Sequence, residues 1–265
     1  MDLRLAGKTA YITGGAHGIG AAIADRLCAE GVRVAIADAD GAALRARGPR
    51  WSSDAGPAVL AECDLSTADG VNRAVETVLE GLGGAPDILV NNVGICVSRE
   101  FADIDDAAWE LTFQLNFMSY VRTCRALAPA MAAAGGAAIV NIASDLAKQP
   151  DTVPADYGAM KSAILHLNKV LARGYAPDVR VNAVLPGPVW TGLWSRRGGI
   201  ADRLAGMYGT DRESAVERYL EDRQLSLGLS EPADVADLVA YLASPLARRI
   251  SGSAFDVGGT IHGLY

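Results

Sequence analysis

The 265-residue sequence lacks a long hydrophobic segment, a basic cluster and a paired cysteine motif. No uninterrupted apolar run approaches the ~18 residues that a membrane-spanning helix needs. The N-terminal segment MDLRLAGKTAYITGG lacks the charged start, long apolar stretch and small-residue cleavage site of a secretory signal. We therefore expect a soluble cytoplasmic protein with no membrane partner.

Positive charge is also scarce, since the formal net charge is −7. No segment gathers enough Lys and Arg to release counterions from a phosphate backbone, so a nucleic-acid partner is not expected. The four cysteines are scattered, with no CxxC pair and no His at metal-ligand spacing. We expect reduced thiols and no metal site. The cysteines are Cys28, Cys63, Cys96 and Cys124.

Short β-rich apolar runs alternate with longer segments of helical spacing along the whole chain. The predicted strands are Thr9–Thr13, Val32–Ala37, Val59–Cys63, Ile88–Val90, Ala138–Ile142, Val179–Val184 and Ala254–Val257. The predicted helices are Ile19–Glu30, Ala68–Leu82, Ala107–Ala134, Tyr157–Gly174 and Pro232–Ser244.

Buried strands separated by helices indicate a parallel sheet that is covered on both faces. The predicted fold class is α/β, a doubly wound Rossmann-type sheet of about seven strands. With no repeat or linker in the sequence, we expect one dinucleotide-binding catalytic domain over residues 1–265. Residues 186–230 lack strand character and are expected to form a substrate lid within it.

A glycine-rich turn follows the first predicted strand and precedes a helix. The turn runs from Thr13 to Gly20, with Gly14, Gly18 and Gly20 as the implicated glycines and Ile19 beginning the helix. Glycines let the backbone approach a pyrophosphate, and the N–H groups of a helix start favour the anion. A tight turn that needs positive φ is the alternative interpretation of the same pattern.

Asp38 distinguishes between these interpretations, because it ends the second strand about twenty residues after the turn. A carboxylate there accepts hydrogen bonds from a ribose diol and repels a 2′-phosphate, which favours NAD over NADP. The first Arg or Lys after Asp38 is Arg45. His17 is either a minor cofactor contact or a solvent-facing turn residue.

Tyr157 and Lys161 lie four residues apart, so on one helix their side chains project from the same face. A free tyrosine, with a pKa near 10, is a poor base at neutral pH, and a lysine ammonium beside it lowers that pKa. Ser144 follows the fifth strand at its carboxyl end, the edge at which open α/β sheets bind ligands. Alone, each feature is also compatible with an ordinary surface pair or turn residue.

Together these elements resemble the short-chain dehydrogenase/reductase family. The resemblance is carried by the TGxxxGxG turn, Asn91-Asn92-Val93-Gly94, Asn116, Ser144, the Tyr157-to-Lys161 segment, Pro186-Gly187 and Thr191. It covers nearly the whole chain. Val93, where Ala is commoner, and Asp145, where a small residue is usual, depart from the family pattern.

The resemblance implies an NAD-dependent oxidoreductase that transfers a hydride between the cofactor and a secondary alcohol or ketone. Tyr157 is then the acid–base, Ser144 holds the substrate oxygen, Lys161 also binds the nicotinamide ribose, and Asn116 binds a water in a proton relay. A homotetramer is implied as well, through the helices Ala107–Ala134 and Tyr157–Gly174.

Further cofactor contacts are implied in the same way. Asp64 and Leu65 would contact the adenine, Asn92 and Gly94 would lie under the ribose, and Val189 and Thr191 would contact the nicotinamide carboxamide. For Asp64, a helix N-cap is the alternative role, since Ser66 and Asp69 begin a helical stretch.

The substrate is the least defined part of the prediction. Trp190 and Trp194 in the lid favour a moderately sized apolar or cyclic substrate, or else they pack the lid onto the body. Asp145 either contacts a second polar group of the substrate or shapes its own loop. An NAD-binding regulator, an epimerase- or dehydratase-like enzyme and a structural subunit are the alternative functions.

Overall fold

The computed structural model describes residues 1–151 and 153–258 and contains a seven-stranded, fully parallel sheet. Its strand order is β3-β2-β1-β4-β5-β6-β7, so the order reverses between β1 and β4. The strands are β1 (Thr9–Thr13), β2 (Arg33–Asp38), β3 (Val59–Glu62), β4 (Ile88–Asn91), β5 (Ala137–Ile142), β6 (Val179–Pro186) and β7 (Ala254–Val257). The predicted doubly wound α/β fold is confirmed.

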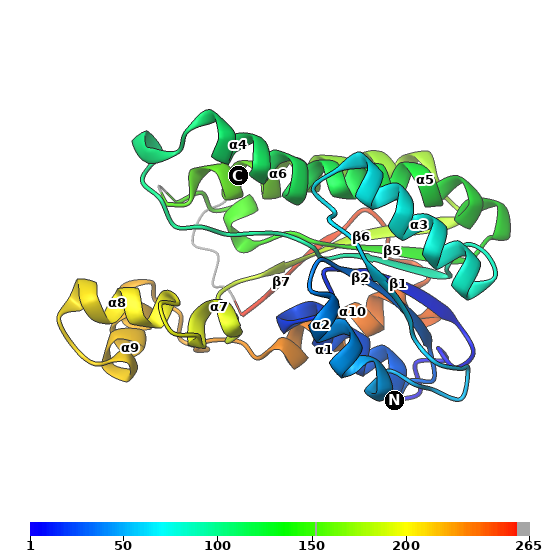
Figure 1. Ribbon diagram of the computed structural model, residues 1–265, viewed down its shortest axis with the longest axis horizontal. Coiled ribbons are helices and arrows are strands. Elements are labelled where there is room, and N and C mark those ends of the chain that lie inside the picture. Colours follow the sequence, from blue (N-terminus) through cyan, green and yellow to red (C-terminus); the bar gives the residue numbers. More distant parts are fainter. Residues whose placement is uncertain (152, 259–265) are drawn as a thin grey trace.

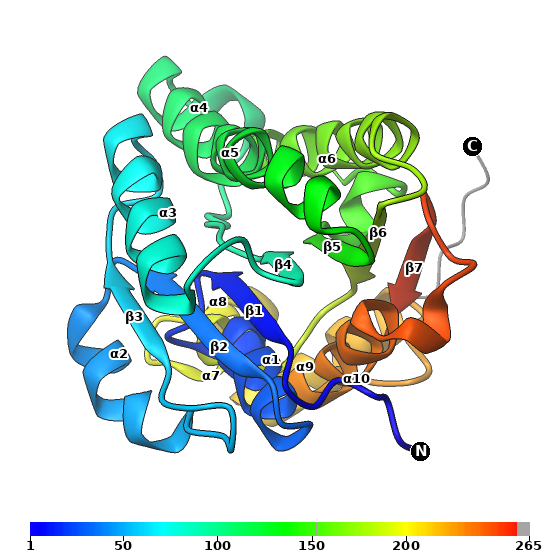
Figure 2. The same ribbon diagram turned by 90° about the vertical axis from the view of Figure 1, so that its right-hand side faces the viewer.

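Helices cover both faces of the sheet (Figure 2). One face carries α1 (Gly18–Ala29), α2 (Gly41–Arg47) and α10 (Pro232–Ala243). The other carries α3 (Ala68–Leu82), α4 (Asp106–Phe113), α5 (Ser119–Ala134) and α6 (Ala155–Gly174). Within the described residues, no helix is both long and apolar enough to cross a membrane.

Each central strand is apolar on both sides, because alternate residues point to opposite faces of a sheet. In β1, Ala10 and Ile12 join the core under α1 and α10, whereas Tyr11 joins the core under α3 and α5. These side chains are completely buried. The continuous apolar runs in the sequence therefore reflect two cores, one on each face.

Local signals in the sequence set the ends of several helices. The side chain of Thr67 caps α3 by accepting a hydrogen bond from Gly70 N at 3.0 Å, and Gly83 ends the helix in the left-handed region. The predicted bounds of α3, β1 and β7 match the structure. The short helix α2 was not predicted.

The predicted helix Ala107–Ala134 is not continuous. A π-helical turn, Gln114–Met118, separates α4 from α5 and contains the buried Asn116. Such turns insert a residue into a helix and frequently occur at functional sites. The correction matters because it changes the side-chain register on either side of Asn116.

Residues 190–230 form a separate excursion that contains α7 (Gly192–Ser195), α8 (Ile200–Tyr208) and α9 (Arg212–Asp222). This α7–α9 unit projects beyond one end of the sheet (Figure 1). Trp190 N donates to Ser230 O at 2.8 Å and Ser230 N donates to Pro188 O at 3.0 Å. The excursion therefore leaves and rejoins the body at adjacent points.

Candidate active site

The predicted site residues converge at the carboxyl edge of the sheet, around the point where the strand order reverses. The loop after β4 is tied to the glycine-rich turn after β1, because Asn92 Nδ2 donates to Thr13 O at 3.0 Å and to Gly14 O at 2.8 Å. Thr13 Oγ1 accepts hydrogen bonds from the backbone N–H groups of Asn92 and Val93. Asn92 thus holds the turn in shape.

The turn and the start of α1 have the features of a dinucleotide-phosphate site. A Cβ on Gly20 would lie only 2.2 Å from Gly14 O, so the close packing of helix against turn requires glycine there. His17 at the N-cap makes no side-chain hydrogen bond to the helix, and the first turn of α1 has no acidic residue. The helix start thus offers free N–H groups and positive dipole to an anion.

Asp38 lies at the end of β2 with its carboxylate against the same turn. Its Oδ2 accepts from Ala16 N at 3.0 Å and its Oδ1 accepts from Asp40 N at 3.0 Å. His17 is exposed, and its Nε2 lies 2.8 Å from Asp40 Oδ2. Arg45 donates to Glu62 at 2.7 Å, so this cation is already paired with a carboxylate.

Ser144, Tyr157 and Lys161 meet where β5 ends beside the first turns of α6. Ser144 is 6% exposed, and its side chain lies close enough to Tyr157 to oppose the rise in the Tyr157 pKa that burial causes. Lys161 is 2% exposed, and its Nζ lies 5.4 Å from the centre of the Tyr157 ring. The structure therefore brings together the three residues to which the sequence assigns the proton chemistry.

The Lys161 ammonium is held by oxygen atoms of β5 and α5. Its Nζ donates to Ile142 O at 2.8 Å and to the Tyr120 hydroxyl at 3.4 Å. Burial lowers the pKa of Lys161 to about 7 and raises the pKa of Tyr157 above its usual value. Both shifts favour the uncharged forms, so a charge formed here depends on nearby polar groups.

Asn116 is completely buried in the π-helical turn, where its side chain hydrogen-bonds to the backbone of Ile95. Its Nδ2 donates to Ile95 O at 2.7 Å, and its Oδ1 accepts from Ile95 N at 2.8 Å. The side chain therefore fixes the loop after β4. Its role in a water-mediated relay stays a prediction.

Gly94 lies directly against the predicted proton-transfer residues. A Cβ at this position would lie 3.1 Å from Asn116 Oδ1 and 3.7 Å from Lys161 Nζ. The missing side chain leaves space beside Lys161 at the sheet edge. Together with the glycine turn, the open start of α1 and Asp38, this cradle fits a nicotinamide dinucleotide.

The remaining predicted cofactor residues occupy the same edge. Thr191 Cγ2 would be 3.4 Å from a Cβ on Gly18, so the segment after β6 lies against the glycine turn, and Val189 is 5% exposed. Ile19 packs against the core, and Leu65 is buried at the end of β3. The alternative N-cap role of Asp64 is wrong, because Thr67 caps α3. Asp64 accepts instead from Ser66 N and Oγ, which lowers its pKa.

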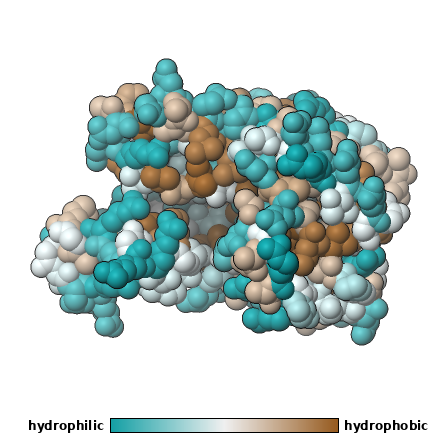
Figure 3. Space-filling model, viewed as in Figure 1, coloured by the Kyte–Doolittle hydropathy of each residue, from teal (hydrophilic) through white to brown (hydrophobic). Residues whose placement is uncertain are grey.

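The two predicted substrate tryptophans have different surroundings. Trp194 is 4% exposed and packs with Leu204 and Ala215 inside the α7–α9 unit, with its ring 5.3 Å from that of Tyr219. This favours the packing role for Trp194. Trp190 is 37% exposed at the start of the unit. The surface is hollowed between this unit and the body (Figure 3).

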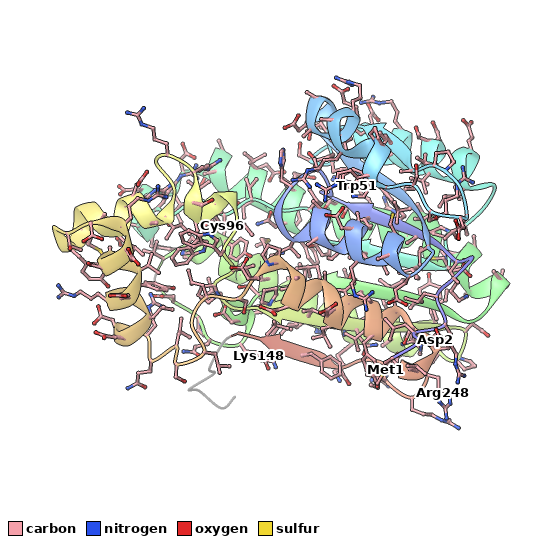
Figure 4. All side chains as sticks on the ribbon, turned by 90° about the horizontal axis from the view of Figure 1, so that it is seen from below. Met1, Asp2, Trp51, Cys96, Lys148 and Arg248 are labelled. Atoms are coloured by element: carbon pink, nitrogen blue, oxygen red, sulfur yellow. The ribbon has the colours of Figure 1, made fainter. Side chains whose placement is uncertain are left out.

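Two side chains near Lys161 were given no role in the site from the sequence. Tyr120 from α5 donates to Ile142 O at 2.9 Å beside Lys161. Cys96 lies on the side of the molecule that carries the α7–α9 unit (Figure 4). Burial raises the pKa of its thiol to about 11, and the nearby charge of Lys161 opposes this rise. Neither residue belongs to a motif with recognisable spacing.

A family model described as enoyl-(acyl carrier protein) reductase matches residues 14–262. The chain is 35% identical to an uncharacterized oxidoreductase, YvrD, of Bacillus subtilis, over the full length of both chains.

Two solved structures are also similar to it. L-sorbose reductase of Gluconobacter frateurii, complexed with NADPH and L-sorbose, has a TM-score of 0.92 and 31% identity, with all of both chains covered. The 3-ketoacyl-(acyl-carrier-protein) reductase of Brucella melitensis, complexed with NADH, has a TM-score of 0.81 and 30% identity, and 96% of this chain and 97% of that chain are covered.

Because Lys161 is buried, its charged form should lower the free energy of unfolding of the cofactor-free protein by an amount that depends on pH. A lysine whose pKa is lowered on folding loses its proton in the folded state first, so stability rises with pH between about 7 and the unfolded value. Lys161→Met removes this titration. We expect the free energy of unfolding of the variant to exceed that of wild type most at pH 7, and the difference to shrink by up to about 1.4 kcal/mol per pH unit toward pH 10.

Chemical denaturation across this pH range measures the difference. Lys169→Met, on the exposed side of the same helix, is the matched control and should show no such pH dependence. A difference between Lys161→Met and wild type that stays constant with pH would contradict the burial argument.

Proposed function

Since the chain belongs to the short-chain dehydrogenase/reductase family and is an oxidoreductase acting on CH–OH groups, we propose that it transfers a hydride between NAD(H) and a secondary alcohol or ketone. The observation that carries the proposal is the meeting of Ser144, Tyr157 and the buried Lys161 at the sheet edge, beside the dinucleotide cradle. Oxidation needs a base for the hydroxyl proton, and reduction needs an acid for the alkoxide.

In this proposal Tyr157 exchanges the proton with the substrate oxygen, and Ser144 orients that oxygen by a hydrogen bond. Lys161, when protonated, stabilises the phenolate form of Tyr157 and binds the ribose next to the reacting ring. The buried carbonyl of Ile142 and the Tyr120 hydroxyl fix the position of Lys161. Asn116 continues the relay toward solvent through a bound water.

The bound cofactor supplies or accepts the hydride. The chain's own residues would hold it along the sheet edge, with the pyrophosphate at the start of α1, a ribose over Gly94 and the nicotinamide near Val189 and Thr191. The proposed contacts are Gly14, His17, Gly18, Ile19, Gly20, Asp38, Asp64, Leu65, Asn92, Gly94, Tyr157, Lys161, Val189 and Thr191.

NAD rather than NADP is the proposed partner. A 2′-phosphate on the adenine ribose would lie near the Asp38 carboxylate, with Asp40 and Glu62 as further carboxylates in the same region. Like charges at such a site cost several kcal/mol. The similar structures were solved with either NADPH or NADH, so the preference rests on these carboxylates.

For the substrate, burial of Trp194 in the α7–α9 unit weakens the expectation of an apolar ligand. The similarity to an L-sorbose reductase favours a hydroxylated ketone or the corresponding alcohol.

We propose the cytoplasm as the location, because the four cysteines are free thiols. The alternative functions are an NAD-binding regulator, an epimerase- or dehydratase-like enzyme and a structural subunit. They would be favoured if no alcohol or ketone in a broad panel of substrates changed the nicotinamide absorbance.

Tyr157→Phe tests the proton chemistry. We expect kcat to fall by a factor of about 10² to 10⁴, because the ring is kept and the proton donor is lost. NADH binding, followed by its fluorescence, should weaken by less than about tenfold, because only one of many cofactor contacts is lost. Wild-type turnover of secondary alcohols and diols with NAD is the reference. Undiminished turnover by Tyr157→Phe would contradict the assigned role.

Asp38→Ser tests the cofactor preference. Wild type should use NAD with a higher kcat/KM than NADP, and the substitution should reduce the ratio at least about tenfold, because it removes the charge that repels a 2′-phosphate. Asp54→Ser, an exposed carboxylate in the loop before β3, is the control and should keep the wild-type ratio. A wild-type preference for NADP would overturn this part of the proposal.

We also propose a homotetramer that assembles through α4, α5 and α6. Leu111 on α4 is 47% exposed and Val170 on α6 is 52% exposed, so apolar side chains lie open on the helical layer. Light scattering at micromolar concentration should give the mass of four chains. Leu111→Glu combined with Val170→Glu should give smaller species, and a monomeric wild type would contradict the assembly.

A further inference from the structure

A cavity of about 230 Å³ is lined by Asp145, the residue that follows Ser144. The residues around it come from the loop after β5 and from the end of α9. They are Asp145, Leu146, Gln149, Pro150, Asp151 and Arg223. Its walls are thus polar and carry both signs of charge.

Asp145 connects this cavity to the proposed catalytic residues. Its Oδ1 accepts from Ser144 Oγ at 2.8 Å and from Leu146 N at 2.8 Å. No hydrogen bond to its Oδ2 is found among the described residues. One carboxylate oxygen therefore fixes the loop and the other is available to a ligand in the cavity. Both roles that the sequence left open for Asp145 are compatible with this arrangement.

Arg223, the residue just after α9, also lines the cavity. It forms an ion pair with Asp151 of the body, and its guanidinium carbon lies 5.5 Å from the centre of the Tyr219 ring. A guanidinium held on one side by a carboxylate and an aromatic ring keeps further N–H donors for other acceptors. Arg223 therefore brings a positioned donor from the α7–α9 unit to the cavity.

We infer that Asp145 and Arg223 recognise a hydroxyl group on the carbon next to the reacting carbinol, so that the enzyme selects vicinal diols and α-hydroxyketones. This inference rests on the proposed function. Because Ser144 Oγ donates to Asp145 at 2.8 Å, a hydroxyl next to a substrate oxygen held by Ser144 would come within reach of the Asp145 carboxylate. Asp145 accepts from that hydroxyl, and Arg223 donates to it or to the next oxygen along the chain.

The opposite charges of Asp145 and Arg223 favour a ligand that is neutral and hydroxylated. Asp145 disfavours a substrate carboxylate, whereas Arg223 disfavours an ammonium group. An apolar substituent would leave Asp145 Oδ2 and the remaining N–H donors of Arg223 without a hydrogen-bond partner in a partly buried site, which is costly. A hydroxyl donates to one group and accepts from the other, so it satisfies both.

The polarity of the surroundings is consistent with this assignment. Burial raises the pKa of Asp145, whereas its hydrogen bonds from Ser144 and Leu146 and the charge of Arg223 oppose the rise. The carboxylate thus depends on donors around it. A substrate hydroxyl would add one more.

Matched pairs of substrates test the inference with NAD as the oxidant. The pairs are 2-butanol with 2,3-butanediol and cyclohexanol with cis-1,2-cyclohexanediol, and the measured quantity is the ratio of kcat/KM for the diol to that for the mono-alcohol. The ratio cancels any general loss from the freed Ser144 hydroxyl. Wild type should favour the diols.

Asp145→Ala and Arg223→Met should each lower the diol to mono-alcohol ratio by about 10- to 100-fold, the range for a lost hydrogen bond to a charged group. Asp145→Asn keeps a hydrogen-bonding oxygen and should restore much of the ratio. Arg218→Met, in α9 shortly before Arg223, is the control, since Arg218 stacks on Tyr208 and does not line the cavity, and it should keep the wild-type ratio.

The outcomes separate the two levels of the proposal. Wild-type turnover combined with ratios in Asp145→Ala and Arg223→Met within twofold of wild type would overturn the inference and leave the proposed function intact. A wild-type preference for the mono-alcohols would also overturn it. Absence of turnover for every pair with either NAD or NADP would contradict the proposed function itself and the inference with it.

Discussion

The buried ammonium group of Lys161 is the constraint on which the site depends. A lysine that is 2% exposed must find its partners within the fold, and it finds them in Ile142 O at the end of β5 and the Tyr120 hydroxyl on α5. These contacts fix the first turns of α6 against the sheet edge. Tyr157, one turn earlier, is thereby held beside Ser144.

The same edge is kept open for a cofactor by small residues and backbone hydrogen bonds. Gly94 leaves space next to Lys161. Asn116 fixes the loop that carries Gly94, because its side-chain amide hydrogen-bonds to both the N–H and the carbonyl of Ile95. Asn92 does the same for the glycine turn. The side-chain amides of Asn92 and Asn116 thus fix the backbone that forms the cradle.

Patterns that are local in sequence predicted most of the fold and much of the site. The apolar runs predicted the bounds of β1 and β7 correctly, because buried parallel strands are apolar on both faces. The one-residue insertion at Asn116 was missed, because helical periodicity continues on either side of a π turn. Arg223 was missed because its neighbours in sequence balance its charge, and only folding places it opposite Asp145.

The central claim is that Lys161 makes Tyr157 a stronger acid in the cofactor-loaded protein. Nuclear magnetic resonance of protein labelled with ¹³C at the tyrosine hydroxyl carbon, saturated with NAD, measures the pKa of Tyr157 directly, with Tyr157→Phe to assign the signal. The account predicts a clearly lower Tyr157 pKa in wild type than in Lys161→Met, because only wild type has a cation beside the phenolate. Equal pKa values in the two proteins would contradict it.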